Sequence, residues 1–156
     1  MNTIEIQRIY ATDSQPSDTQ LEFWVNTVLA DLNEELEIVV RIVDENESAQ
    51  LNQTYRHKNG ATNILSFTFE LPDGVELDEP TLLGDLVICA PVLEREAFEQ
   101  NKLLINHWAH IVIHGTLHLL GYDHIDDADA QEMESEEITL LHTLSIPNPY
   151  ENGSDL

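Results

Sequence analysis

Basic residues are scarce in this chain of 156 residues, which has six Lys and Arg against 30 Asp and Glu and a formal net charge of −24. A protein that binds nucleic acid through a broad basic surface needs many Lys and Arg side chains to neutralise the phosphates. The composition therefore excludes such a surface. It indicates instead a strongly acidic, well-solvated protein.

Cysteine and long apolar runs are also nearly missing. The single Cys89 excludes a disulfide within the chain, and its place in the apolar stretch DLVICA predicts a buried structural thiol. A chain without disulfides fits a reducing compartment, so we expect a cytoplasmic protein. No apolar run approaches the ~20 residues of a membrane span. The N-terminal MNTIEIQRIY lacks the basic and apolar regions of a secretory signal, and we expect no membrane association.

The acidic residues avoid two segments. Residues 48–69 and 100–122 contain no Asp or Glu, although 45 positions would hold about nine at the chain's average of 30 in 156. The acids gather instead in residues 70–79 and after residue 125, where no Lys or Arg occurs. Burial would explain the absence of acids from the second segment but not from the polar TYRHKNGATN of the first. We expect the two segments to line one concave face.

The periodicity of apolar residues predicts an α+β fold in a single domain. Alternating or β-branched segments predict strands over residues 4–10, 36–44, 63–70 and 82–90. Helical spacing predicts helices over residues 16–35, 47–56, 91–100, 103–120 and 126–144. We expect a roughly four-stranded mixed sheet packed with about five helices, and a metal-site helix like that of the metzincins. The domain should cover residues 1–148, followed by a flexible C-terminal tail over 149–156.

Five of the chain's seven histidines fall in residues 107–127, HWAHIVIHGTLHLLGYDHIDD. Three of them fit the pattern His114-x-x-x-His118-x-x-Gly121-x-x-His124. Residues four apart share one face of a helix, so the imidazoles of His114 and His118 can meet at one metal ion. Gly121 can adopt the positive φ that ends a helix, which lets His124 approach the same point from the turn. Three histidine ligands leave a fourth position open, as in catalytic zinc sites.

This spacing matches the metzincin metalloprotease motif H-E-x-x-H-x-x-G-x-x-H with one difference. Gly115 occupies the position of the glutamate, which is the general base of peptide hydrolysis. The sequence therefore favours a metal site that lacks the protease's proton carrier. A metzincin-like metalloprotease stays as an alternative.

Other polar residues are candidates for supporting roles. His110 and His107 precede His114 on the same helical face, and either could orient a ligand imidazole or carry a proton. Simple packing near the start of the helix would explain both equally well. Asp123 and Asp85 could likewise each orient a ligand imidazole.

Arg56 and Lys58 are the basic residues of the first acid-free segment. A guanidinium group stays charged and can hold a phosphate through two parallel hydrogen bonds. The neutral donors around it would support such a site. These residues alone do not distinguish a phosphate site from an ordinary exposed loop.

Three segments, HGTLHLLGYDH, TYRHKNGATNILSF and LLGDLVICAP, closely resemble the YbeY family of bacterial metal-dependent endoribonucleases, and the resemblance spans nearly the whole chain. It implies one zinc ion per chain, bound by His114, His118 and His124, and a catalytic role for Arg56. It also implies cleavage of single-stranded RNA, and a part in 16S ribosomal RNA 3′-end maturation and in ribosome quality control. The implied partners are ribosomal RNA and the ribosome or its small subunit with associated proteins. Lys58 then becomes a candidate RNA contact.

The sequence leaves parts of the chemistry open. The proton acceptor could be His110, Asp85, a metal hydroxide or the RNA 2′-hydroxyl, and either water or the 2′-hydroxyl could attack. Trp108 and Tyr122 could stack a base, although core packing is favoured for Trp108. A non-catalytic ribosome assembly factor with a structural metal is a further alternative.

Overall fold

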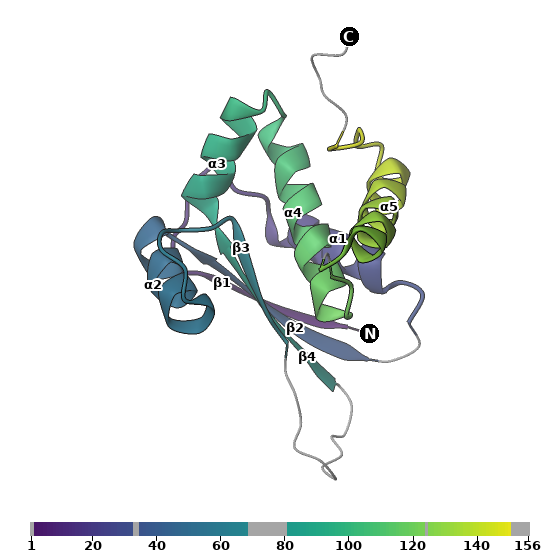
Figure 1. Cartoon of the computed structure of the whole chain (residues 1–156), viewed down its shortest axis with the longest axis horizontal. Coiled ribbons are helices and arrows are strands. Elements are labelled where there is room, and N and C mark those ends of the chain that lie inside the picture. Colours follow the sequence, from purple (N-terminus) through teal and green to yellow (C-terminus); the bar gives the residue numbers. More distant parts are fainter. Residues whose placement is uncertain (1, 33–34, 69–80, 124, 151–156) are drawn as a thin grey trace.

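The computed structural model describes residues 2–32, 35–68, 81–123 and 125–150, in which a four-stranded sheet packs with five helices (Figure 1). The strands follow the order β1-β2-β4-β3 across the sheet. Their bounds are β1 Thr3–Arg8, β2 Leu36–Val43, β3 Ile64–Thr68 and β4 Thr81–Cys89. Strands β1, β2 and β4 are parallel, whereas β3 lies at the edge and runs antiparallel to β4. The predicted mixed sheet of an α+β fold is therefore confirmed, and the acid-rich residues 70–79 lie outside the described residues.

The five helices begin close to the predicted positions. Their bounds are α1 Asp18–Leu29, α2 Glu45–Arg56, α3 Ala90–Glu99, α4 Leu104–Leu119 and α5 Asp127–Thr143. Side chains of Ser17, Asp44 and Asp126 each accept a backbone N–H of the following first turn. These caps satisfy donors that the helix itself leaves unpaired, which fixes where α1, α2 and α5 start. Within the described part of the chain, none of the helices is both long and apolar enough to cross a membrane.

The sheet separates a large core from a small one. The larger core lies between the sheet and helices α1 and α4, with Ile38, Val40 and Leu86 fully buried in it. The smaller one lies on the opposite face beneath α2 and includes Val87 and Cys89. The prediction of a buried Cys89 is confirmed, and burial raises the pKa of its thiol.

Helix α4 is the central element of the fold. It contacts α1, α3, α5 and strands β3 and β4 (Figure 1), and eleven of its 16 residues are buried. A helix that is apolar on almost every side needs neighbours around it. The polar side chains of α4 are therefore held in fixed surroundings, and those surroundings decide what they can do.

Gly121 ends α4 in the way that the sequence predicts. Its φ of +103° lies in the left-handed region. The N–H of Gly121 donates to the carbonyl of His118 at 3.0 Å, and the N–H of Tyr122 donates to that of Leu117 at 3.1 Å. This pair of bonds is the Schellman motif, in which the chain reverses just after the last helical turn. The reversal brings the carbonyl of Tyr122 back toward the helix end.

Replacing Gly121 with alanine should lower the free energy of unfolding by about 1–2 kcal/mol, because a Cβ disfavours the left-handed conformation. No atom of the described residues lies within 4 Å of the position that the Cβ would occupy, so these residues add no crowding to this cost. Urea unfolding of the metal-free protein would measure the change. Gly121→Asn is the matched control and should lose less, since asparagine tolerates positive φ. Equal stability of the alanine variant and the wild type would contradict this account of the helix end.

Candidate metal centre and groove

Four imidazoles stand in a row along α4. The ring centroids of His107 and His110 are 6.3 Å apart, those of His110 and His114 6.1 Å, and those of His114 and His118 4.6 Å. The spacing of three or four residues between neighbours places them on one side of the helix. The row confirms the predicted shared face, and its members differ mainly in their hydrogen-bond partners.

His114 and His118 direct the same ring nitrogen toward each other. Their Nε2 atoms are 3.2 Å apart. The Nδ1 of His114 lies 3.0 Å from Glu137 Oε1, and the Nδ1 of His118 lies 3.0 Å from the carbonyl oxygen of Tyr122. Carboxylate and carbonyl oxygens only accept, so each Nδ1 carries the hydrogen. In the neutral rings the two Nε2 lone pairs therefore converge on one point.

This donor set fits a metal ion. Tetrahedral coordination with metal–nitrogen distances of about 2.0–2.1 Å separates two ligand nitrogens by about 3.3–3.4 Å. The observed 3.2 Å between the Nε2 atoms of His114 and His118 is close to that separation. A hydrogen bond from the other ring nitrogen to a carboxylate or carbonyl is the usual support of a histidine ligand. The predicted third ligand, His124, lies outside the described residues.

Glu137 of α5 forms a second polar group beside His114. Its carboxylate is fully buried, and its Oε1 accepts from His110 Nε2 at 2.8 Å and from His114 Nδ1 at 3.0 Å. Burial alone would raise the pKa of Glu137, but these hydrogen bonds and the nearby imidazoles lower it to about 2, so the carboxylate is ionised at neutral pH. Burial lowers the pKa of His110, which keeps that ring neutral. Ligand atoms of His110, His114 and Glu137 lie within 4.8 Å of one another, so this group too could hold a metal ion.

The sequence reasoning missed Glu137. Helix α5 contains many acidic residues, and composition alone does not distinguish Glu137 from the others. The distinguishing signal is its spacing, because Met133, Glu137 and Leu141 follow one another every four residues and all three are buried. A carboxylate in the apolar stripe of a helix needs buried donors opposite it. The histidine row of α4 supplies them.

A groove of about 580 Å³ opens beside His114 and His118. Residues of both acid-free segments line it, together with the turn after α4. The lining comprises Asn52, Arg56, Lys58, Thr62, Asn63, Ile64, Leu65, Ser66, Thr68, His114, His118, Gly121, Tyr122 and Asp123. The expectation that the two acid-free segments share one concave face is met. Among the described residues, two basic side chains and one carboxylate lie on this lining, although the whole chain carries five times more acids than bases.

Arg56 is positioned at the edge of the sheet, in the last turn of α2. Its Nη2 donates to the carbonyl of Ser66 on β3 at 2.7 Å. Its guanidinium carbon lies 5.7 Å from the centroid of the Phe67 ring, within the range of a cation–π contact. The ring of Tyr55 packs edge-on against Phe67 at 5.4 Å. These contacts hold the guanidinium on the rim of the groove that contains His114 and His118.

The loop after Arg56 is anchored by buried polar side chains of α2. Asn52 Nδ2 donates to the carbonyl of Gly60 at 2.9 Å. The Ser48 hydroxyl donates to the carbonyl of Thr62 at 3.1 Å and accepts from its N–H at 3.0 Å. This loop carries Lys58, so α2 fixes both basic residues of the groove.

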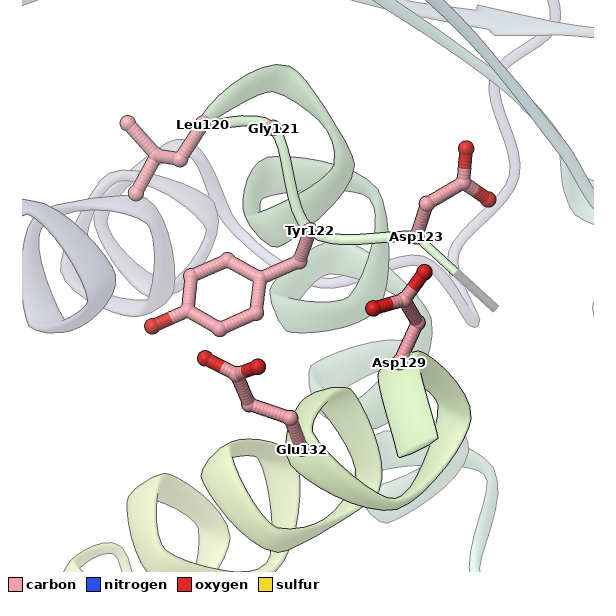
Figure 2. Close-up of a pocket in the computed structure, with 6 residues that line it drawn as sticks. All are labelled: Leu120, Gly121, Tyr122, Asp123, Asp129 and Glu132. Atoms are coloured by element: carbon pink, nitrogen blue, oxygen red, sulfur yellow. The ribbon is translucent and has the colours of Figure 1, made fainter. Parts of the chain in front are cut away.

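A smaller depression of about 260 Å³ has the opposite charge (Figure 2). It lies between the end of α4 and the start of α5 and is lined by Asp123, Asp129 and Glu132, of which Glu132 lies beside the ring of Tyr122. Burial and the charges of Glu136 and Glu132 raise the pKa of the Tyr122 hydroxyl. This depression repels phosphate, whereas the neighbouring groove can accept it. Tyr122 and Asp123 line both.

Three other candidates lie away from the groove lining. Asp85 falls on the opposite face of the sheet, since side chains alternate along a strand and its neighbour Leu86 packs against Gly115 of α4. The structure therefore does not bring Asp85 to the histidines, and the idea that it orients a ligand is wrong. His107 is buried and pairs with Glu96 at 2.9 Å. Trp108 is buried in the core, as favoured from the sequence.

Comparison with known proteins identifies the family. The family model described as Endoribonuclease YbeY matches residues 6–145. Endoribonuclease YbeY of Colwellia psychrerythraea is 51% identical over 153 residues, which cover 96% of this chain and 97% of the relative. Endoribonuclease YbeY of Nitrosococcus oceani is 53% identical over 150 residues, with the same coverage of 96% and 97%.

The fold has a counterpart among solved structures. The solution structure of TM1509 from Thermotoga maritima superposes with a TM-score of 0.54 and covers 98% of both chains at 20% identity. That likeness supports the α+β architecture, and the family match rests on the sequence relatives. The family model and the two sequence relatives show that this chain belongs to the YbeY endoribonuclease family.

Proposed function

We propose that this chain is a metal-dependent endoribonuclease that cleaves single-stranded RNA in the groove beside α4. The observation that carries the proposal is the convergence of His114 Nε2 and His118 Nε2, 3.2 Å apart, on a groove that also contains Arg56. A divalent ion, a polarising cation and room for a polymer are the parts that phosphodiester cleavage needs. The endoribonuclease relatives support this assignment.

We propose that one zinc ion is held by His114, His118 and His124. The buried group of His110, His114 and Glu137 is the alternative position for an ion. Its carboxylate is fully enclosed and already accepts hydrogen bonds from both histidines. An ion enclosed there would have no access to a substrate, whereas His114 and His118 line the groove. When bound at the groove, the ion supplies Lewis-acid polarisation of a phosphoryl oxygen or lowers the pKa of a water molecule to about 7.

Arg56 has the clearest role among the residues of the chain. A guanidinium keeps its charge at any relevant pH and stabilises negative charge that grows on phosphoryl oxygens in the transition state. Its bond to Ser66 and its contact with Phe67 hold it in place before the substrate arrives. Lys58 on the same lining is placed to contact a neighbouring phosphate. Among the described residues, His110 and Asp85 do not belong to the groove lining, so the groove does not support either of them as the proton acceptor.

The charge of the protein bears on how the substrate arrives. Two basic side chains on the groove allow few phosphate contacts, and a net charge of −24 repels RNA at a distance. Affinity for free RNA should therefore be weak. We propose that the substrate is delivered by the ribosome or its small subunit, that the reaction serves 16S ribosomal RNA 3′-end maturation and ribosome quality control, and that the protein works in the cytoplasm.

Arg56→Ala should lower the rate of cleavage of a single-stranded RNA by about 10²–10³, the usual effect of losing one group that stabilises transition-state charge. His114→Ala should remove both metal binding and cleavage. Rates on a fluorescent oligonucleotide, with zinc content measured in the same samples, would test both. The matched control is Arg95→Ala, since Arg95 pairs with Glu45 on the surface and does not line the groove.

Wild-type cleavage no faster than that of the Arg56 and His114 variants would contradict the nuclease proposal. The non-catalytic assembly factor with a structural metal would then be the better account. The variants also reveal contaminating ribonucleases, because a contaminant cleaves equally in every sample.

The metzincin-like protease alternative conflicts with the packing at Gly115. This residue is buried, and a Cβ there would lie 2.4 Å from Ile64 Cδ1 and 3.0 Å from Leu86 Cδ2. The position faces strands β3 and β4, so a side chain there would have to displace the ends of Ile64 and Leu86, and the chain has no glutamate at the place that peptide hydrolysis requires. Metal-loaded protein incubated with casein should therefore leave it intact while single-stranded RNA is cut. Cleavage of casein alone would reverse the assignment.

The salt dependence of RNA binding should be shallow. Two phosphate contacts on a single strand predict a slope of about −1.4 for log K against log salt, at ~0.7 per contact. Lys58→Ala should reduce the slope by about half. Fluorescence anisotropy with a labelled oligonucleotide between low and moderate salt would measure it. A slope several times steeper would show that phosphates are bound elsewhere on the protein.

A further inference from the structure

The Glu137 carboxylate lies at the centre of a buried network that joins three parts of the chain. Its Oε1 accepts from His110 and His114 of α4, at 2.8 and 3.0 Å. Both of its oxygens lie 3.0 Å from the hydroxyl of Tyr150, which donates to them. A fully buried carboxylate is costly unless donors surround it, and here three side chains do so.

The network determines which nitrogen of His114 faces the groove. Because Glu137 Oε1 can only accept, the hydrogen of His114 stays on Nδ1, and the Nε2 lone pair points toward Nε2 of His118. Bonds from the far nitrogen of a histidine ligand to a carboxylate fix the ring orientation and raise its basicity. The carboxylate thus acts on the groove through an imidazole, without reaching the groove itself.

Tyr150 connects the C-terminal segment to this network. Its ring stands edge-on to His110 with centroids 5.4 Å apart. Its N–H donates to Asn148 Oδ1 at 2.8 Å, and Lys102 Nζ donates to the carbonyl of Pro149 at 3.0 Å. Residues 149 and 150, placed in a flexible tail from the sequence, are held in this structure. The remaining tail residues, 151–156, lie outside the described part.

We propose that Glu137 is a positioning residue for the metal centre. Its carboxylate holds His114 in the tautomer and orientation that bind the ion, and Tyr150 of the C-terminal segment holds that carboxylate in place through its hydroxyl. This inference rests on the proposed metal site. It gives α5 and the C-terminal segment a role in metal binding, although Glu137 and Tyr150 do not line the groove. In this proposal Glu137 supports a metal ligand and is not a ligand itself. An ion bound directly by Glu137 and His110 would occupy a different site.

Three variants of the full chain would test the role of Glu137. Glu137→Met keeps the side-chain volume and removes the acceptor. Glu137→Gln keeps an acceptor and removes the charge. Glu132→Gln is the control, because Glu132 is exposed on the same helix and its loss changes the net charge equally. Zinc affinity would be measured by chelator competition, and the tautomer of His114 by nitrogen-15 NMR of the metal-free protein.

The proposal predicts a graded loss. Glu137→Met should weaken zinc binding by about 10–100-fold, the range seen when a carboxylate partner of a histidine ligand is removed, and His114 should no longer hold its hydrogen only on Nδ1. Glu137→Gln should keep the tautomer and lose less affinity. Glu132→Gln should match the wild type. Wild-type zinc affinity and an unchanged tautomer in Glu137→Met would overturn the proposal.

Tyr150→Phe provides a second test that does not disturb the core, since Tyr150 is half exposed. Loss of the hydroxyl should weaken zinc binding by severalfold, while the metal-free protein should keep the circular dichroism spectrum of the folded wild type. An unchanged affinity would overturn the part assigned to the C-terminal segment.

His118→Ala distinguishes failure of this inference from failure of the metal site. If His118→Ala loses zinc while Glu137→Met keeps it, the groove site stands and the positioning role is wrong. If His118→Ala keeps zinc and Glu137→Met loses it entirely, Glu137 is a ligand of a buried ion, and both the positioning role and the proposed site are overturned. The NMR readout on metal-free protein tests the tautomer whether or not RNA is cleaved.

Discussion

The pairing of two imidazoles across one turn of α4 is the interaction on which the rest of this structure depends. His114 and His118 bring their Nε2 atoms to 3.2 Å because the far nitrogen of each ring already donates to a fixed oxygen. One of those oxygens belongs to Glu137 on α5. The other belongs to Tyr122, which the positive φ of Gly121 turns back onto the helix end. The packing of α5 and the turn at the end of α4 thus determine which nitrogens of His114 and His118 are left to bind a metal ion.

The extreme acidity of the chain is compatible with a phosphate substrate because the charge is unevenly distributed. Acids line the depression after α4, whereas the described part of the adjacent groove carries Arg56 and Lys58 and one carboxylate, that of Asp123. Helix α2 and strand β3 form the basic part of the groove, and buried polar side chains of α2 hold the loop that carries Lys58. Such an arrangement favours a substrate that is brought to the groove by a larger particle over one captured from solution.

Much of the fold followed from the sequence, because periodicity and caps act locally. The four strands, the five helices and the glycine end of α4 were predicted, most of them within a few residues, although α1 ends at Leu29 and the predicted helix extended to residue 35. The meeting of Arg56 with the histidines was expected from the shortage of acids in two segments. Glu137 and Tyr150 were not found, because their partners are set by how α5 and the C-terminal segment pack on α4. Asp85 was wrongly expected near the histidines, because the sequence did not reveal which side chains of β4 face α4.

Anomalous diffraction from crystals soaked in zinc would test the central claim most directly. One anomalous peak is expected on the groove, about 2.0–2.1 Å from the Nε2 atoms of both His114 and His118. The Glu137 carboxylate should remain hydrogen-bonded to Nδ1 on the opposite side of the His114 ring. A peak enclosed between His110, His114 Nδ1 and Glu137, or full occupancy at a place that touches neither Nε2 atom, would contradict it.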